Sequence, residues 1–218
     1  MAGLKVIITG ATGMVGEGVL FECLQNPKVA EVLIVSRRHY ELSHSKLREL
    51  IVADFFQLEK YAKQVEGYDA CFFCAGISSV GMKEEKYTHI TYDTTIAFAK
   101  NLLSVNKNMV FCFVSGAHTD SSEKGRIMWA RVKGRTENEL LKLGFKAAYN
   151  FRPGGMYPFE GQKNWKKLYK FIVKIIRVVA PKAIITLHEL GAAMINSVTK
   201  GYPHSILEIK DIRQLAKD

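Results

Sequence analysis

Three glycines spaced three residues apart give this sequence its clearest chemical signal. They lie in Thr9–Gly16 (TGATGMVG), between the apolar run Val6–Ile8 and a helical pattern. Gly10 permits a tight turn, Gly13 lets the backbone approach a pyrophosphate, and Gly16 lets the helix pack closely. The first amides of the helix favour an anion. We therefore expect a dinucleotide site, with a ligand-free strand–turn–helix as the alternative, and contacts from Gly10, Thr12, Gly13, Met14, Val15 and Gly16.

Two arginines end the second expected strand. In an open parallel sheet, ligands bind beyond the carboxyl ends of the strands. Arg37 and Arg38 follow Gly16 by about twenty residues, where an acid would accept hydrogen bonds from the ribose 2′-hydroxyl of NAD. Arginine instead offers a planar fork for a 2′-phosphate. The pair favours NADP over NAD as the cofactor, and the alternative is a solvated basic turn.

The next two strand ends carry residues suited to the rest of such a cofactor. Asp54 can meet the amino group of adenine, and Phe55 can cover the face of its ring. After the fourth strand, Cys74, Ala75 and Gly76 are small enough to let the middle of the cofactor pass close to the backbone. We expect all five residues to contact the cofactor.

Cys71 and Cys74 form a C-x-x-C pattern, which suggests a metal or redox site. The pair lies in a strand-like segment, where residues three apart point to opposite faces. We therefore interpret these cysteines as small buried hydrophobic residues and expect no metal site.

Strand and helix patterns alternate along almost the whole chain, which is typical of a doubly wound parallel sheet. The central strands are apolar on both faces, so helices must cover both. We expect a single α/β domain of Rossmann type over 1–218, with a small C-terminal substrate-covering lobe at 153–199, where the alternation lapses. The expected strands are 5–9, 32–36, 49–52, 69–75, 109–115, 147–152 and 205–209. The first expected helix follows the glycine turn and ends near 24. The next three span 58–65, 84–103 and 128–143, and Asp211 opens a short terminal helix.

Basic residues exceed acidic ones, with 31 Lys and Arg against 21 Asp and Glu. The segment 164–179 puts cations on one helical face and apolar residues on the other. It predicts a core-facing helix with a solvated basic face; an anionic membrane surface or a protein contact is the alternative. Nucleic acid is not an expected partner, because no basic, aromatic-studded sheet accompanies the charge. With no signal peptide and no apolar run of roughly 20 residues, we expect a cytoplasmic protein.

The order of these residues resembles the extended and atypical short-chain dehydrogenase/reductases. The resemblance rests on the glycine turn, on Asp54, Cys74-Ala75-Gly76 and Ser115, and on Lys133 and Arg152-Pro153-Gly154. Within that superfamily the chain is most similar to compact members related to NAD-dependent epimerase/dehydratases and to Tat-interacting oxidoreductase-like proteins. The resemblance implies that Pro153 and Gly154 also contact the cofactor.

The family's mechanism uses a Ser, a Tyr that transfers a proton, and a Lys four residues after the Tyr. The resemblance assigns catalytic roles to Ser115 and Lys133, and a ribose contact to Lys133. However, Trp129 stands four residues before the lysine, and an indole is a donor only. Ala117 also stands where many relatives place a reactive hydroxyl. The acid is therefore open among Tyr87, Tyr92, His118 and Tyr157.

Two functions remain open from the sequence. The first is an NADP(H)-dependent oxidoreductase or epimerase-like enzyme on a small carbonyl or sugar substrate. The second is a non-catalytic NADP-binding regulatory or interaction protein. Relatives often pair through the helices that correspond to 84–103 and 128–143, so we expect a homodimer.

Overall fold

The computed structural model describes residues 3–159, 161–164 and 183–217. Seven strands form one parallel sheet in the order β3-β2-β1-β4-β5-β6-β9, and two more strands form a separate parallel pair. The strands of the large sheet are β1 (Leu4–Thr9), β2 (Val29–Ser36), β3 (Leu47–Ile51), β4 (Ala70–Phe73), β5 (Val110–Val114), β6 (Ala147–Phe151) and β9 (Ile206–Leu207); the pair is β7 (Gly155–Tyr157) and β8 (Ile184–Thr186).

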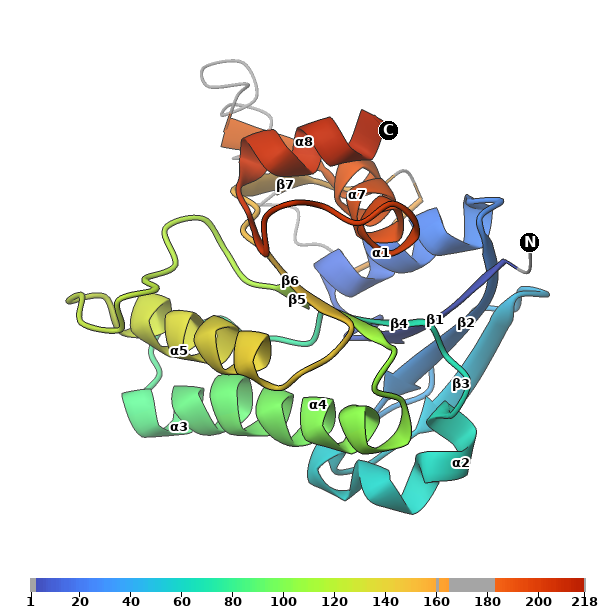
Figure 1. Cartoon of the computed structure of the whole chain (residues 1–218), viewed down its shortest axis with the longest axis horizontal. Coiled ribbons are helices and arrows are strands. Elements are labelled where there is room, and N and C mark those ends of the chain that lie inside the picture. Colours follow the sequence, from blue (N-terminus) through green and yellow to red (C-terminus); the bar gives the residue numbers. More distant parts are fainter. Residues whose placement is uncertain (1–2, 160, 165–182, 218) are drawn as a thin grey trace.

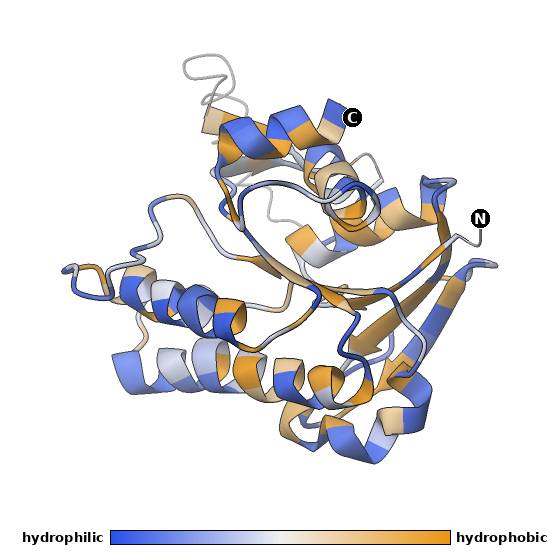
Figure 2. Cartoon of the chain, in the orientation of Figure 1, coloured by the Kyte–Doolittle hydropathy of each residue, from blue (hydrophilic) through white to orange (hydrophobic). Residues whose placement is uncertain are grey.

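Helices cover both faces of the large sheet (Figure 1). Two separate clusters of buried apolar side chains lie between the sheet and these helices. Figure 2 shows mostly hydrophobic strands and a mostly hydrophilic α5. One face carries α1 (Met14–Gln25), α7 (Leu187–Thr199) and α8 (Ile209–Lys217); the other carries the 3-10 helix η1 (Phe55–Tyr61), α2 (Ala62–Val65), α4 (Thr94–Val105) and α5 (Met128–Lys142). The expected Rossmann-type α/β fold is confirmed.

Two expected helices are less regular than the sequence indicates. The helix expected at 84–103 is divided into α3 (Glu84–Thr88), a π-helical turn η2 (His89–Asp93) and α4. The helix expected at 58–65 begins as the 3-10 helix η1, since the Asp54 carboxylate accepts a hydrogen bond from the amide of Phe56 and so starts the turn early. Apolar periodicity marks both helices, but it does not distinguish α from 3-10 or π winding.

The terminal helix begins two residues before the expected position. α8 starts at Ile209, and the Asp211 carboxylate lies in its first turn, where it accepts a hydrogen bond from the Glu208 amide at 3.0 Å. The acid therefore caps the helix from inside its first turn. Boundary shifts of this size are usual where a helix frays.

Strand and helix also alternate after residue 183, although the sequence pattern shows no alternation over 153–199. β8 leads into α7, which a capping box formed by Thr186 and Glu189 opens. The helix lies against α1 through two glycines: a Cβ on Gly18 would lie 2.6 Å from the Leu187 side chain, and one on Gly191 would lie 2.6 Å from that of Glu22. Nine of the thirteen residues of α7 are buried, because α1, α8 and side chains of the large sheet pack against it.

Candidate functional site

The glycine turn connects β1 to α1 by close backbone contacts. Gly10 has a φ of +73°, and a Cβ there would lie 2.7 Å from the backbone of Cys74 and Ala75. A Cβ on Gly16 would lie 2.2 Å from the Gly10 carbonyl oxygen. These two glycines are therefore required by the fold itself, since any side chain would displace backbone atoms.

Gly13 is different, because the chain leaves room beside it. A Cβ there would meet only the Gly10 carbonyl oxygen, at 3.4 Å, and its φ of −108° suits any residue. Gly13 is the N-cap of α1 and provides no side-chain cap for the first amides of the helix. The N-terminus of α1 thus presents uncapped amides beside an exposed glycine, which is the arrangement that binds phosphate groups in other helices.

A cleft of about 490 Å³ opens at the carboxyl ends of β1, β2 and β4. It brings together nine of the sequence-predicted cofactor residues: Gly10, Thr12, Gly13, Arg37, Asp54, Phe55, Cys74, Ala75 and Gly76. Met14, Val15, Gly16 and Arg38 do not line it, although Met14 follows Gly13 and Arg38 follows Arg37 in the chain. Residues as far apart in the chain as Gly10 and Thr94 therefore meet at one place, as the strand order requires.

The arginine turn after β2 is exposed. The Ser36 hydroxyl donates a hydrogen bond to the Arg38 carbonyl oxygen and so fixes the turn. Tyr40, just beyond it, donates its hydroxyl proton to buried Glu17 of α1 at 2.8 Å. No described residue forms an ion pair with Arg37 or Arg38. The guanidinium of Arg37 is thus available to an anion in the cleft.

The part of the cleft beside Asp54 contains two aromatic residues that the sequence did not single out. Phe56 and His89 stack at 5.3 Å between ring centroids and 13° between ring planes, and both line the cleft. Phe55 is mostly buried against Phe98, 5.0 Å away between centroids. Asp54 is exposed, but its carboxylate also caps η1. The sequence did not point to His89, because the segment that carries it was expected to be ordinary helix and is a π-helical turn.

The end of β5 holds the two residues assigned a catalytic role. The Ser115 hydroxyl lies 2.9 Å from the Thr119 hydroxyl, and the Thr119 hydroxyl donates to the Gly116 carbonyl oxygen at 2.8 Å. The Lys133 ammonium, from α5, donates to the carbonyl oxygens of Val114 at 3.2 Å and Ser115 at 3.0 Å. Burial lowers the pKa of Lys133 to about 8, and the negative charge of Glu137 opposes that shift. The structure therefore brings Ser115 and Lys133 together.

Trp129 lies beside this strand end, at the start of α5. A Cβ on Gly116 would lie 3.8 Å from the edge of its indole ring. The ring is half-buried and lies near Gly116, the residue after Ser115. It offers an N–H donor and no group that can exchange a proton near neutral pH.

The four alternative acids lie in unlike surroundings. Tyr87 is 2% exposed, and burial raises its pKa. The ring of Tyr92 is covered by the guanidinium of Arg135, 4.1 Å from its centroid. His118 is exposed in a left-handed backbone conformation with φ of +67°. Tyr157 belongs to β7, outside the large sheet.

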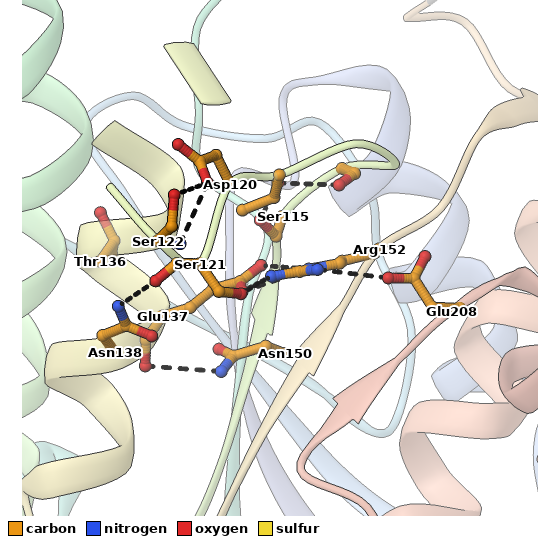
Figure 3. Close-up of polar contacts among 12 residues, drawn as sticks. Ser115, Asp120, Ser121, Ser122, Thr136, Glu137, Asn138, Asn150, Arg152 and Glu208 are labelled. Carbon is orange, nitrogen blue, oxygen red and sulfur yellow. Dashed lines mark hydrogen bonds and ion pairs between the residues drawn. The ribbon is translucent and has the colours of Figure 1, made fainter. Parts of the chain in front are cut away.

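A buried ion pair anchors the loop between β5 and α5. The Arg152 guanidinium donates to both carboxylate oxygens of Glu137, at 3.0 and 3.2 Å from Nε, and to Glu208 at 3.2 Å (Figure 3). It also donates to the Ser121 hydroxyl. Glu137 is fully buried, and the pair joins α5, β6 and the loop.

Pro153 and Gly154 follow Arg152 in the chain, and neither residue lines the cleft. The Ala117 amide donates to the Pro153 carbonyl oxygen at 2.8 Å. A Cβ on Gly154 would lie 2.6 Å from the Ala183 carbonyl oxygen. Their predicted contact with the cofactor remains a prediction.

Only one cysteine of the C-x-x-C pattern lines the cleft. Cys71 is buried within β4 and Cys74 is half-buried in the cleft lining, and burial raises the pKa of both thiols. Among the described residues, no group of three His, Cys, Asp or Glu side chains is arranged to hold a metal ion.

Most of the basic segment 164–179 lies outside the described residues, so its helical character and its partner remain predictions. No helix within the described ranges is long and apolar enough to cross a membrane.

With this geometry established, similarity to known proteins is informative. Residues 6–124 match the NAD dependent epimerase/dehydratase family, and the chain belongs to it. Protein HTATIP2 of Rattus norvegicus is 27% identical over 157 residues, which cover 71% of this chain and 63% of that protein. Protein fmp52-1, mitochondrial, of Aspergillus terreus is 30% identical over 157 residues, covering 69% of this chain and 66% of that protein. The aligned part thus spans just under two thirds of either relative.

A solved structure supports the fold independently of sequence. The Bordetella bronchiseptica enzyme WbmF in complex with NAD+ matches with a TM-score of 0.69 at 14% identity, over 99% of this chain and 77% of that one. At this identity the match concerns the fold alone.

Proposed function

We propose that this chain binds NADP(H) in the cleft and uses it in an oxidoreductase or epimerase-like reaction on a small carbonyl or sugar substrate. The observation that carries the proposal is the cleft itself. It joins an uncapped helix N-terminus at Gly13, an unpaired guanidinium at Arg37, and the aromatic and acidic residues around Asp54. Membership of a family named for NAD, and a neighbour solved with NAD+, support a nicotinamide dinucleotide as the ligand.

The residues present fit such a cofactor. The α1 amides and Gly13 would hold the pyrophosphate, and Arg37 with Arg38 would hold a 2′-phosphate on the adenosine ribose. Asp54, Phe55, Phe56 and His89 would surround the adenine. Ser115 and Lys133 would face the reacting end, where the nicotinamide supplies or accepts a hydride when bound.

A binding experiment tests the cofactor. NADPH and NADH are titrated separately against the protein by fluorescence. We expect NADPH to bind at least about tenfold more tightly, because a charge-assisted contact contributes roughly 1.5–3 kcal/mol. Equal affinity for the two would contradict the role given to Arg37 and Arg38.

A turnover experiment tests the chemistry. NADPH absorbance is followed with a panel of aldehydes, ketones and quinones, using the wild-type protein and Lys133→Ala. Turnover that the substitution abolishes supports the enzyme, whereas turnover that it leaves unchanged contradicts the site assignment.

A non-catalytic NADP-binding regulatory or interaction protein is the second candidate. Trp129 favours it, because the family Tyr that moves the proton is missing at this position. Tight NADPH binding with no turnover across the panel is the result it predicts. A homodimer, a cytoplasmic location, and a substrate-covering role for 153–199 remain proposals; the A. terreus relative is named mitochondrial.

A further inference from the structure

The hydrogen bonds at the end of β5 determine where the Ser115 and Thr119 hydroxyls donate their protons. A threonine hydroxyl has one proton, and a carbonyl oxygen can only accept. Because Thr119 donates its proton to the Gly116 carbonyl oxygen, the 2.9 Å contact with Ser115 requires Ser115 to donate to Thr119. Both hydroxyl protons are therefore committed within the chain. Ser115 presents lone pairs to a ligand and acts as an acceptor.

The Lys133 ammonium keeps one N–H donor for a ligand. Two of its three N–H groups bind the carbonyl oxygens of Val114 and Ser115, and the third has no partner among the described residues. These two bonds fix the ammonium at the strand end, next to the acceptor Ser115. No other ionisable group is held at this position by a described contact.

The surroundings of Lys133 suit an amine that gains and loses a proton near neutral pH. The ring of Phe113 lies 5.4 Å from the nitrogen, and only carbonyl oxygens reach it from β5. The charged group that acts on Lys133 is Glu137, one turn further along α5, and Glu137 is itself paired with Arg152, the residue after β6. Burial lowers the pKa of Lys133 by more than the Glu137 carboxylate raises it, and the resulting pKa is about 8.

We propose, on the basis of the proposed function, that Lys133 is itself the proton donor of this site and that Thr119 positions Ser115 as a hydrogen-bond acceptor. In carbonyl reduction, one N–H bond of the Lys133 ammonium breaks and an O–H bond forms at the substrate oxygen. The reduced dinucleotide supplies the hydride that the carbonyl carbon receives. The neutral amine then regains a proton from water, so that no further reactant is needed.

The first test measures Lys133 without any turnover. The protein is labelled with acetic anhydride at a series of pH values, and acetylation of each lysine is followed by mass spectrometry. We expect half-maximal reactivity of Lys133 at about pH 8, against roughly 10.4 for an unperturbed lysine. Lys142 lies on the same helix with 72% of its side chain exposed, so it serves as the reference for a lysine that the reagent reaches freely. A Lys133 that titrates like an unperturbed lysine overturns the proposal.

The second test uses two substitutions and their combination. Lys133→Arg keeps the charge and the donors, but it cannot release a proton. We expect kcat to fall by about 100-fold or more, with the Kd for NADPH within about threefold. Adding Trp129→Tyr supplies a group that can transfer a proton, and it should restore kcat at least about tenfold in the Lys133→Arg background. A lysine that serves only the ribose would lower NADPH affinity and would not be rescued.

Two further outcomes separate this inference from the proposed function. Turnover by the wild type together with full kcat in Lys133→Arg overturns the acid role alone. Tight NADPH binding without turnover on any substrate overturns the proposed activity, and the acid role with it. Thr119→Val should release the Ser115 proton and change the pH profile of kcat, whereas Thr119→Ser should retain the wild-type profile. Identical profiles for all three proteins overturn the role of Thr119.

Discussion

Gly13 and Gly16 belong to one sequence motif, but the structure predicts opposite consequences for replacing them. A Cβ on Gly16 would overlap the Gly10 carbonyl oxygen at 2.2 Å, and backbone must move to relieve it. Overpacking costs about 1–3 kcal/mol, and this contact with rigid backbone belongs at the upper end. Alanine returns about 1 kcal/mol through helix propensity. We therefore expect Gly16→Ala to lower the free energy of unfolding by about 2 kcal/mol and Tm by roughly 4–8 °C.

Gly13→Ala is the matched comparison. Its Cβ would make an ordinary contact at 3.4 Å, and its φ of −108° needs no glycine. Alanine is the poorer N-cap, but it also restricts the unfolded chain by about 0.4–1 kcal/mol. These terms offset, so stability should stay within about 1 kcal/mol. NADPH binding should nevertheless be lost, because the methyl group fills the space left for the pyrophosphate.

Thermal and urea unfolding monitored by circular dichroism measure the first effect, and fluorescence titration with NADPH measures the second. A Gly16→Ala variant that unfolds like the wild type, or a Gly13→Ala variant that binds NADPH with unchanged affinity, would contradict the roles given to these two glycines. The second result would place the pyrophosphate away from the turn.

Arg37→Gln should weaken NADPH binding at least about tenfold and leave NADH binding within about twofold; Arg48→Gln, at an exposed position on β3, is the control in the same titration. Glu137→Gln should lower the free energy of unfolding by about 3–5 kcal/mol, because the buried Arg152 guanidinium loses its main charge partner; a urea-measured loss below about 1 kcal/mol contradicts that account. Because burial lowers the pKa of folded Lys133 to about 8, the unfolded chain binds more protons between pH 8 and roughly 10.4. Stability relative to Lys133→Met should therefore rise across that interval, and a flat difference between the two urea curves would show that the lysine is not buried.

The lining of the cleft could be predicted from the sequence because its signals are local. A parallel strand buried on both faces is a continuous apolar run, and the turn that follows needs glycine at fixed spacing. Arg37, Asp54 and Gly76 were then found by their position after successive strands, and all three line the cleft. Once the strands are located, the topology determines which strand ends meet.

What the sequence missed depends on pairings across long separations. Glu137 and Arg152 are 15 residues apart, and Glu208 is a further 56, so no helical or strand period marks the network. Thr119 lies in the irregular loop after β5, and no pattern of residue types predicts the contacts of its hydroxyl with Ser115 and Gly116. His89 reaches the cleft because the helix widens by a π-helical turn, which composition does not reveal.

The cleft and the end of β5 are held in place by different contacts, so a substitution can change one without changing the other. The cleft rests on β1, β2, β4 and the glycine turn. The end of β5 is held by α5 and the Arg152 ion pair, and a Cβ on Gly134 of α5 would lie 1.8 Å from the Asp120 carbonyl oxygen, so helix and loop are packed together there. A change at Trp129 can therefore alter proton transfer while the cleft keeps its shape. Trp129→Tyr should accordingly leave the Kd for NADPH within about twofold while it changes the pH profile of kcat; a parallel loss of NADPH affinity would show that the cleft and the end of β5 are coupled.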